Sequence, residues 1–224
     1  MSLSAVIFDL DGTLLDTIED LTDSMNAALA RMGLPGRSIA ECRNLVGDGL
    51  DTFVRRALPD GVRDDPAAAA RLKDLMRGEY RLRGKDKTRP YVGITDLLDE
   101  LARRGTRMAV LSNKPHDSTG TIVRHFFPSW RFDPVFGARD GVPVKPDPAG
   151  ALEIARAWGL APAEIAYVGD TNTDMQTAAA AGMFACGALW GFRTAAELAA
   201  NGANVLLEKP AELLDFIGTS PLTS

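Results

Sequence analysis

Two acidic side chains near the start of the chain have the residue type and spacing of a reactive site. Residues 7–15 read Ile-Phe-Asp-Leu-Asp-Gly-Thr-Leu-Leu, so Asp9 and Asp11 come directly after the apolar run at 5–8. Aspartate is depleted in strands because its short polar side chain competes for backbone hydrogen bonds. The sequence therefore predicts that a buried strand ends here, with two carboxylates at its carboxyl end.

Three further groups of polar residues occur at similar places. Ser-Asn-Lys at 112–114 follows an apolar run, Lys145 lies in a proline-rich loop before a predicted helix, and Asp170 and Asp174 follow the run at 165–168. Any one of them would be explained by a turn, a strand exit or a helix start. Four such groups in order, each beside a predicted strand or helix end, indicate a functional site.

The residue types predict which chemistry this site performs. Carboxylates converge only where a cation neutralises them, and hard oxygen ligands with no neighbouring histidine or cysteine favour Mg²⁺. A lysine and a serine beside such a metal indicate an anion with several oxygens. A phosphoryl group fits, because Mg²⁺ and Lys145 would offset its charge while Ser112 and loop amides orient it.

The elements that must position these residues alternate between strand and helix in the second half of the chain. Apolar strands separated by helical patterns predict βαβ units and a parallel sheet. The expected strands are 5–8, 107–111, 134–136, 165–168, 183–188 and 204–206. The expected helices are 95–104, 117–126, 148–158, 174–181, 195–200 and 211–217.

Between the first strand and about residue 88 the sequence predicts helices only. Asp16 and Glu19 have the spacing of a helix N-cap and its reciprocal acid. Helical patterns cover 17–32, 39–58 with a break at 46–49, and 67–80. We therefore expect an α/β core made of residues 1–15 and 89–224, with a small all-helical domain, 16–88, inserted after the first strand.

Composition narrows the partners and the compartment. The chain has 224 residues, 46% of them hydrophobic, and its formal net charge of -5 argues against nucleic acid as a partner. No apolar run approaches the roughly 20 residues that span a bilayer. Cys42 and Cys186 form no CxxC pair, which favours free thiols in the cytoplasm over a disulfide or metal site. We expect a monomer or a homodimer.

The four motifs together resemble those of the haloacid dehalogenase superfamily of aspartate-nucleophile phosphatases. They read FDLDGTL, LSNKP, VKPDP and GDTNTD, and the resemblance covers nearly the whole chain. Within the superfamily the chain looks most like the phosphoglycolate phosphatase group, around RPYVGITDLLDELARRG, VLSNKP and LVGDGL. The resemblance implies a Rossmann-like parallel sheet with a helical cap domain. It also implies a Mg²⁺-dependent phosphomonoester hydrolase that acts through an aspartyl-phosphate, with phosphoglycolate as the favoured substrate.

The resemblance also implies roles for individual residues. Asp9 would be the nucleophile, and Asp11 would protonate the leaving alkoxide and then accept a proton from water. The metal would be held by Asp9, the backbone carbonyl of Asp11, and Asp170. Thr13 would support the loop, and Asp174 would steady the metal waters or Lys145.

The remaining roles concern the phosphate and the rest of the substrate. Ser112 and the amide of Asn113 would bind the transferring phosphoryl oxygens together with Lys145. Lys114 is expected to face solvent, as lysines usually do. Arg43, in the helical insert, is a candidate for a second anionic group of the substrate, because arginine suits a carboxylate; a surface arginine is the alternative.

Other activities share this core. A haloacid dehalogenase would use the same nucleophile without Asp11 or Mg²⁺, and both Asp11 and Asp170 argue against it. A mutase of the β-phosphoglucomutase type and a pyrophosphatase differ mainly in the cap and stay open. A non-enzymatic binding module should have lost at least one charged motif residue, and none is missing.

Overall fold

The computed structural model describes residues 3–218. Within this range the chain forms two compact units. The core unit contains the chain up to Leu15 and again from Pro90 onward, and the helical unit is Asp16–Arg89. The two connections pair with each other as short strands, β2 (Leu15–Asp16) and β3 (Arg89–Pro90). We describe each unit by itself.

The core unit is built on a six-stranded sheet in the order β5-β4-β1-β6-β7-β8, and all its strand pairs are parallel. The central strand β1 carries four apolar residues that are fully buried, because both of its neighbours and both faces are covered. The strands are β1 (Ala5–Phe8), β4 (Arg107–Pro115), β5 (Val135–Ala138), β6 (Ile165–Gly169), β7 (Phe184–Ala188) and β8 (Val205–Leu207). The predicted α/β fold with a Rossmann-like parallel sheet is confirmed.

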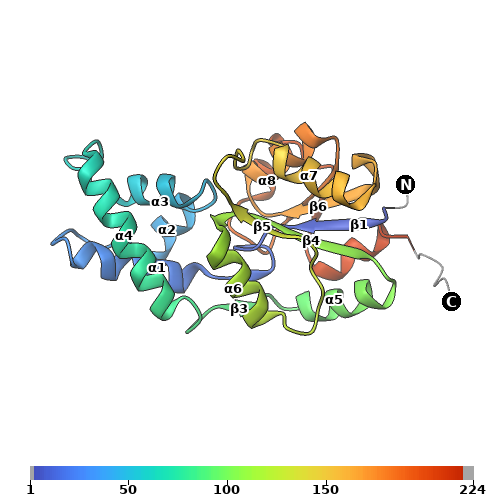
Figure 1. The fold of residues 1–224 in the computed structure, drawn as a ribbon, viewed down its shortest axis with the longest axis horizontal. Helices are drawn as coiled ribbons and strands as arrows, with labels where there is room; N and C mark the ends of the chain where they lie inside the picture. The colour runs from blue at the N-terminus through green and yellow to red at the C-terminus, as the bar shows by residue number, and fades with distance from the viewer. Residues whose placement is uncertain (1–2, 219–224) are drawn as a thin grey trace. The chain divides into compact units, whose positions relative to one another are not determined.

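Helices cover both faces of this sheet, with α5 and α6 on one face and α7 and α8 on the other (Figure 1). In α5 the buried residues Ile94, Leu97, Leu98 and Leu101 follow helical spacing, so that one stripe faces the sheet. The helices are α5 (Ile94–Arg103), α6 (His116–Phe126), α7 (Ala149–Trp158), α8 (Asn172–Ala181) and α9 (Ala195–Ala200).

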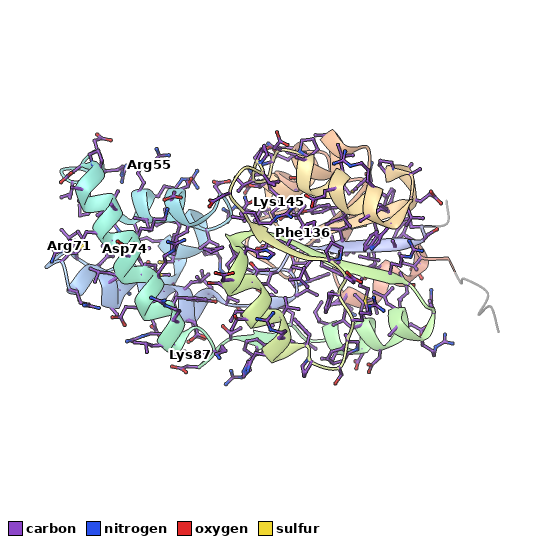
Figure 2. All side chains as sticks on the ribbon, in the orientation of Figure 1. Arg55, Arg71, Asp74, Lys87, Phe136 and Lys145 are labelled. Carbon is purple, nitrogen blue, oxygen red and sulfur yellow. The ribbon has the colours of Figure 1, made fainter. Side chains whose placement is uncertain are left out.

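The helical unit consists of α1 (Ile18–Ala30), α2 (Ile39–Leu45), α3 (Leu50–Ala57) and α4 (Pro66–Arg83). Helix α1 packs against α4 and buries Met25 and Leu29, while α4 buries Leu72 and Met76. Charged residues such as Arg71 and Asp74 occupy the exposed side of α4 (Figure 2). Among residues 3–218, no helix is both long and apolar enough to cross a bilayer.

Three local expectations are wrong. The N-cap of α1 is Thr17, with no side-chain cap bond, and Asp16 only accepts a 3.4 Å hydrogen bond from the Ile18 amide. Strand β4 continues to Pro115, four residues beyond its apolar run, because its later polar residues are also buried. The last element of residues 3–218 is a 3₁₀ helix, Pro210–Asp215, where the sequence predicted an α-helix at 211–217.

Candidate active site

All the predicted core residues lie near the carboxyl edge of the sheet. Asp9 follows β1, Ser112 and Lys114 lie in the last part of β4, and Asp170 follows β6. Parallel strands end at a common edge, so neighbours in the sheet bring residues that are distant in sequence together. The Asp9 amide donates to the carbonyl of Val168 at 2.9 Å, which places the ends of β1 and β6 side by side.

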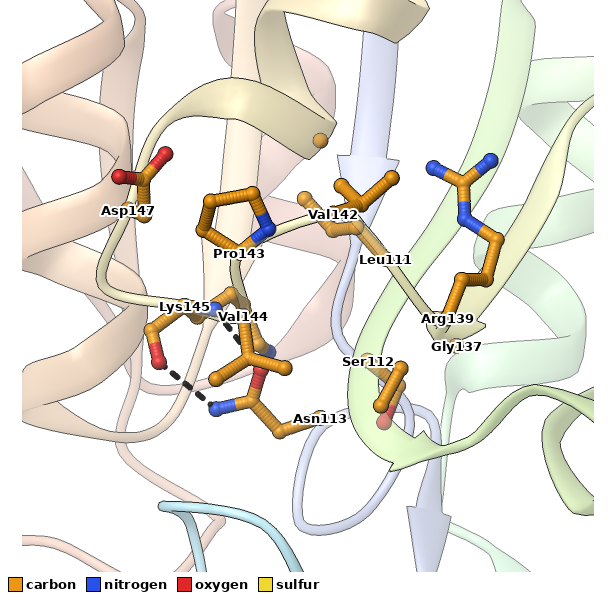
Figure 3. Close-up of a pocket in the computed structure, with 12 residues that line it drawn as sticks. Leu111, Ser112, Asn113, Gly137, Arg139, Val142, Pro143, Val144, Lys145 and Asp147 are labelled. Carbon is orange, nitrogen blue, oxygen red and sulfur yellow. Dashed lines mark hydrogen bonds between the residues drawn. The ribbon is translucent and has the colours of Figure 1, made fainter.

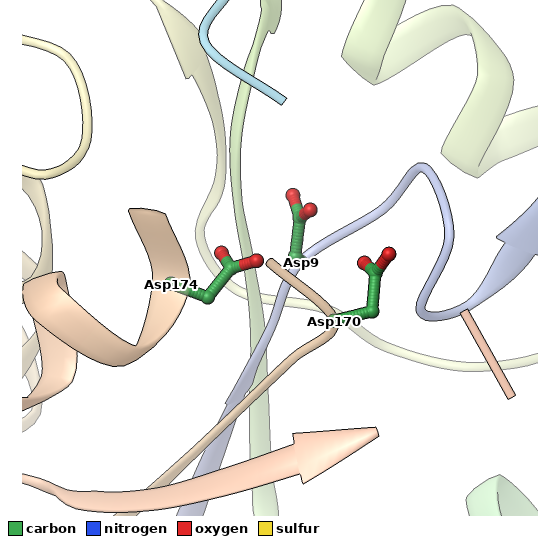
Figure 4. A group of neighbouring side chains, drawn as sticks. All are labelled: Asp9, Asp170 and Asp174. Carbon is green, nitrogen blue, oxygen red and sulfur yellow. The ribbon is translucent and has the colours of Figure 1, made fainter. Parts of the chain in front are cut away.

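Three buried carboxylates meet at this edge: Asp9, Asp170 and Asp174 (Figure 4). One carboxylate oxygen from each lies within 4.8 Å of the others. Burial, followed by the charge of Asp174, raises the pKa of Asp9 to about 7, although Lys145 opposes the shift. Burial and the charges of Asp174 and Asp9 also raise the pKa of Asp170 well above its usual value. This cluster needs positive charge to stay ionised.

Lys145 supplies part of that charge. Its Nζ lies 2.8 Å from Asp9 Oδ1 and 2.7 Å from Asp174 Oδ1, with only 3% of the side chain exposed. Burial disfavours the ammonium, but Asp174 and Asp9 outweigh it, and the pKa of Lys145 is raised well above its ordinary value. One ammonium does not balance the charge of three carboxylates when all three are ionised.

The chemistry of the donor set fits a divalent cation. Asp174 uses one oxygen for Lys145, and its other oxygen accepts hydrogen bonds from the Thr171 amide and hydroxyl at 3.1 and 2.7 Å. It therefore fixes the lysine. Asp9 and Asp170 present carboxylate oxygens at the ends of two adjacent strands. Mg²⁺ and Ca²⁺ prefer such hard oxygen ligands, whereas transition metals more often bind nitrogen or sulfur.

The Asn113 side chain holds Lys145 by its backbone. Its Nδ2 donates to the Lys145 carbonyl at 3.0 Å, and its Oδ1 accepts from the Lys145 amide at 2.9 Å (Figure 3). These two bonds join the end of β4 to the loop before α7. The same segments line a small pocket together with Ser112 and Gly137. The side chain of Asn113 thus fixes the position of Lys145, a role additional to the predicted amide contact.

A loop outside the four sequence motifs holds Asp170. The Phe192 amide donates to Asp170 Oδ2 and the Thr13 hydroxyl to Oδ1, both at 2.8 Å, and the Trp190 indole donates to the Thr13 carbonyl at 2.9 Å. A Cβ on Gly191 would lie 2.2 Å from the Cβ of Asp170. The loop follows β7, the fifth strand that the sequence predicts. Its position at the carboxyl end of a predicted strand is the sequence feature that could have identified it as part of the site.

Lys114 contradicts its predicted exposure. It is buried, and its Nζ binds both carboxylate oxygens of Asp11 at 2.9 and 2.8 Å. The expectation was wrong because the strand continues past Ser112, so the backbone carries this residue into the interior. Its pairing places the Asp11 side chain beside β4.

Arg43 belongs to the helical unit, where it lies exposed in the last turn of α2. Ser112 is buried at the edge of the sheet, and its Oγ accepts from the Lys114 amide at 3.2 Å. His116, at the start of α6, is exposed and accepts through Nδ1 from the Gly137 amide at 3.2 Å. In the core unit the structure thus brings Asp9, Asp170, Asp174 and Lys145 into one cluster.

The fold and the site define an α/β enzyme with a carboxylate and lysine centre at the carboxyl edge of a parallel sheet. Residues 6–188 match the family model of the haloacid dehalogenase-like hydrolases. The chain belongs to this family.

Several phosphatases are similar to this chain in sequence or in structure. A phosphoglycolate phosphatase of Pseudomonas putida is 31% identical over 212 residues, covering 93% of this chain and 78% of the relative. Phosphoglycolate phosphatase 1 of Pseudomonas aeruginosa is 30% identical over 216 residues, with the same coverage of both chains. The crystal structure of a predicted phosphoglycolate phosphatase from Haemophilus somnus 129pt has a TM-score of 0.89 at 26% identity, covering 96% of this chain and 98% of that chain.

Proposed function

We propose that this phosphatase hydrolyses phosphoglycolate to glycolate and phosphate through a phosphorylated Asp9. The observation that carries the proposal is the position of the Asp9 carboxylate, at the end of β1, in contact with Lys145 and beside Asp170. A carboxylate in contact with an ammonium can approach a phosphate dianion with less repulsion. The names of the curated relatives support the choice of substrate.

In the first step, a carboxylate oxygen of Asp9 attacks phosphorus. The bond from phosphorus to the ester oxygen breaks, its electron pair stays on that oxygen, and the oxygen takes the proton of the Asp11 carboxyl group. Ser112 Oγ and the Asn113 amide would orient the phosphoryl oxygens, and Lys145 would offset their charge. The products of this step are glycolate and the aspartyl-phosphate.

In the second step, a water oxygen attacks the phosphorus of the aspartyl-phosphate. Asp11, now a carboxylate, accepts the proton that the water loses, and the bond between phosphorus and the Asp9 oxygen breaks with its electron pair returning to Asp9. The enzyme ends with Asp9 ionised and Asp11 protonated, ready for the next cycle. Atoms and charge balance without an external reductant or oxidant.

We assign the cation site to Asp9, Asp170 and the backbone carbonyl of Asp11, with Mg²⁺ as the ion. When bound, Mg²⁺ would supply positive charge to the phosphoryl oxygens and to the crowded carboxylates. Asp174 keeps Lys145 in place, and Thr13 and the Phe192 amide keep Asp170 in place. The buried carboxylates and their raised pKa values support a cation here.

Trapping the intermediate tests the nucleophile. In the wild-type enzyme, incubation with Mg²⁺ and fluoroaluminate or beryllofluoride should give a complex whose metallofluoride is attached to Asp9. Asp9→Asn should fold and lose essentially all turnover, because a neutral amide does not attack phosphorus. An adduct on any other residue would overturn the assignment.

Substitution of Arg43 tests the choice of phosphoglycolate as the substrate. A charge-assisted arginine–carboxylate contact is worth about 1.5–3 kcal/mol, or roughly one to two decades in rate. Arg43→Ala should therefore lower kcat/KM for phosphoglycolate by about that factor and leave 4-nitrophenyl phosphate almost unchanged. Arg55→Ala removes another exposed arginine of the helical unit and should change neither.

The substrate comparison has its own contrary results. Equal losses on both esters in Arg43→Ala would mean that Arg43 acts on the helical unit and not on a carboxylate. Faster turnover of pyrophosphate or of β-glucose 1-phosphate than of phosphoglycolate by the wild-type enzyme would contradict the substrate, and the trapping experiment would still report on Asp9.

A further inference from the structure

Lys114 and Asp11 form a buried ion pair beside the catalytic carboxylates. The lysine Nζ donates to both oxygens of Asp11 at 2.9 and 2.8 Å, and the two side chains are 6% and 13% exposed. Lysine is almost never buried unless it is paired. In the ionised form of Asp11, two bonds from one ammonium restrict the rotation of its side chain. In the protonated form, one oxygen carries the proton and the other still accepts from Lys114 Nζ, so the lysine continues to orient the carboxyl group.

The backbone of Lys114 is itself held tightly. Its amide donates to Ser112 Oγ at 3.2 Å, and its carbonyl accepts from the Thr119 hydroxyl at 3.2 Å. Gly137 on β5 packs so closely that a Cβ there would lie 2.5 Å from the same carbonyl. The regular pairing of β4 with β5 is interrupted between Leu111 and Pro115, an irregularity that re-aims side chains beside active sites. The backbone of Lys114 is therefore fixed at the point from which its side chain reaches Asp11.

The side chain of Asp11 is held by a residue of another strand, while its backbone lies in a hydrogen-bonded turn. It lies outside the group of three carboxylates, in a tight turn whose Gly12 has φ of 89° and donates to the Leu15 carbonyl. A group that transfers protons must stay within hydrogen-bond reach of the reacting oxygen, and a shift of about 1 Å costs about 10²-fold in rate.

We propose that Lys114 is a positioning residue that orients the Asp11 carboxyl group for proton transfer to the leaving oxygen. The inference rests on the role of Asp11 in the proposed function. In the substrate-binding alternative, Lys114 would leave Asp11 and bind a phosphoryl oxygen. The two roles differ in one observable, because an acid matters for a basic leaving group, whereas a phosphate-binding cation matters for every ester.

Two aryl esters of nearly equal size separate these roles. Nitrophenolate leaves without a proton, while phenolate is more basic and benefits from one. Lys114→Met keeps an unbranched apolar side chain and removes the charge. It should lower kcat/KM for phenyl phosphate about 10- to 100-fold, part of the 10²–10⁴ that acid–base catalysis contributes, and lower it for 4-nitrophenyl phosphate less than about threefold. A kcat/KM for phenyl phosphate in Lys114→Arg close to that of the wild type would support the same role, because a guanidinium also donates two hydrogen bonds to a carboxylate.

Two reference variants make the result decisive. Asp11→Asn should show the same selective loss, and Lys209→Met, which removes an exposed lysine, should show none. If Asp11→Asn is selective and Lys114→Met lowers both esters equally or neither, the positioning role is wrong while the proposed function stands. If Asp11→Asn itself is not selective, the acid role of Asp11 is wrong and the inference falls with it. Thermal unfolding of each variant shows that the folded enzyme is being compared.

Discussion

Asp9 combines an exposed fraction of 6% with two carboxylate neighbours and one ammonium neighbour. Its pKa is raised from the ordinary value of 3.8 to about 7, first by burial and then by the charge of Asp174. A group whose folded pKa is raised binds protons more tightly in the folded chain. Between pH 3.8 and about 7 the folded state therefore holds more protons, and stability falls as pH rises.

That sign predicts the behaviour of the metal-free enzyme. In excess chelator, the unfolding midpoint of the wild type should fall as pH rises from about 4 to about 7, the range set by the two pKa values of Asp9. Asp9→Asn should reduce part of this dependence on pH and be more stable than the wild type at pH 8. Asp140→Asn, which changes an exposed carboxylate, is the control and should show the pH dependence of the wild type. Mg²⁺ at pH 8 should raise the wild-type midpoint, since a ligand of the folded state stabilises it. Parallel slopes for wild type and Asp9→Asn would contradict the prediction.

At the level of elements, the loop after β7 is as much a part of the site as the four motifs. It contacts Asp170 through the Phe192 amide and packs Gly191 against the same side chain and the Gly12 carbonyl. Glycine is required at 191 because of this close approach, and its φ is not positive. The loop and the first turn therefore fix Asp170 from two directions.

Gly191→Ala should disturb the site more than the fold. Its Cβ would lie 2.2 Å from Asp170 Cβ and 2.5 Å from the Gly12 carbonyl, so Asp170 must move. Loss of such support costs metal sites about 10- to 100-fold in affinity. We expect a rise of that size in the Mg²⁺ concentration for half-maximal activity.

Gly78→Ala is the matched control for this substitution. It lies inside α4, and apart from the neighbouring backbone of its own helix no atom lies within 4 Å of its added Cβ. It should stabilise the protein by about 0.5–1 kcal/mol without changing the Mg²⁺ requirement, because alanine is the better helix former. An unchanged Mg²⁺ requirement in Gly191→Ala would show that Asp170 is not held by this packing.

At the scale of the whole molecule, the chain leaves the core after Leu15 and returns at Pro90. Within the helical unit, Asp20 on α1 ties the returning segment down. Its carboxylate accepts from the amides of Lys87 and Thr88 and from the Thr88 hydroxyl, at 2.7–3.1 Å, and it is 1% exposed. A single buried carboxylate thus fixes the end of the insert to its beginning.

Asp20→Ala should loosen that end without touching the core site. Removing the acceptor leaves buried donors unsatisfied, at a cost of about 1–3 kcal/mol. Hydrogen exchange at residues 84–89 should accelerate, while the Mg²⁺ requirement stays that of the wild type. Asp23→Ala removes only the exposed contact to Lys87 Nζ and should leave exchange in this segment nearly unchanged. Equal exchange in the two variants would show that Asp20 does not hold the segment.

Local chemistry in the sequence determined most of the fold and the position of the motif residues. Apolar runs of strand length between helical patterns predicted the parallel sheet, because burial imposes its period on the side chains. Asp9 and Asp170 were placed at strand ends by the same logic, since a carboxylate stops an apolar strand. The roles of Ser112, Lys145 and Arg43 in turnover stay predictions.

Only the tertiary structure decided how the motif residues are held. Lys114 resembles an ordinary surface lysine in the sequence, and its burial depends on β4 continuing to Pro115 and on a partner about 100 positions away. The Asn113 bonds to Lys145 and the loop after β7 likewise join segments that are remote in sequence. Such contacts follow from which strands become neighbours, and a single sequence does not contain that information in its local periodicity.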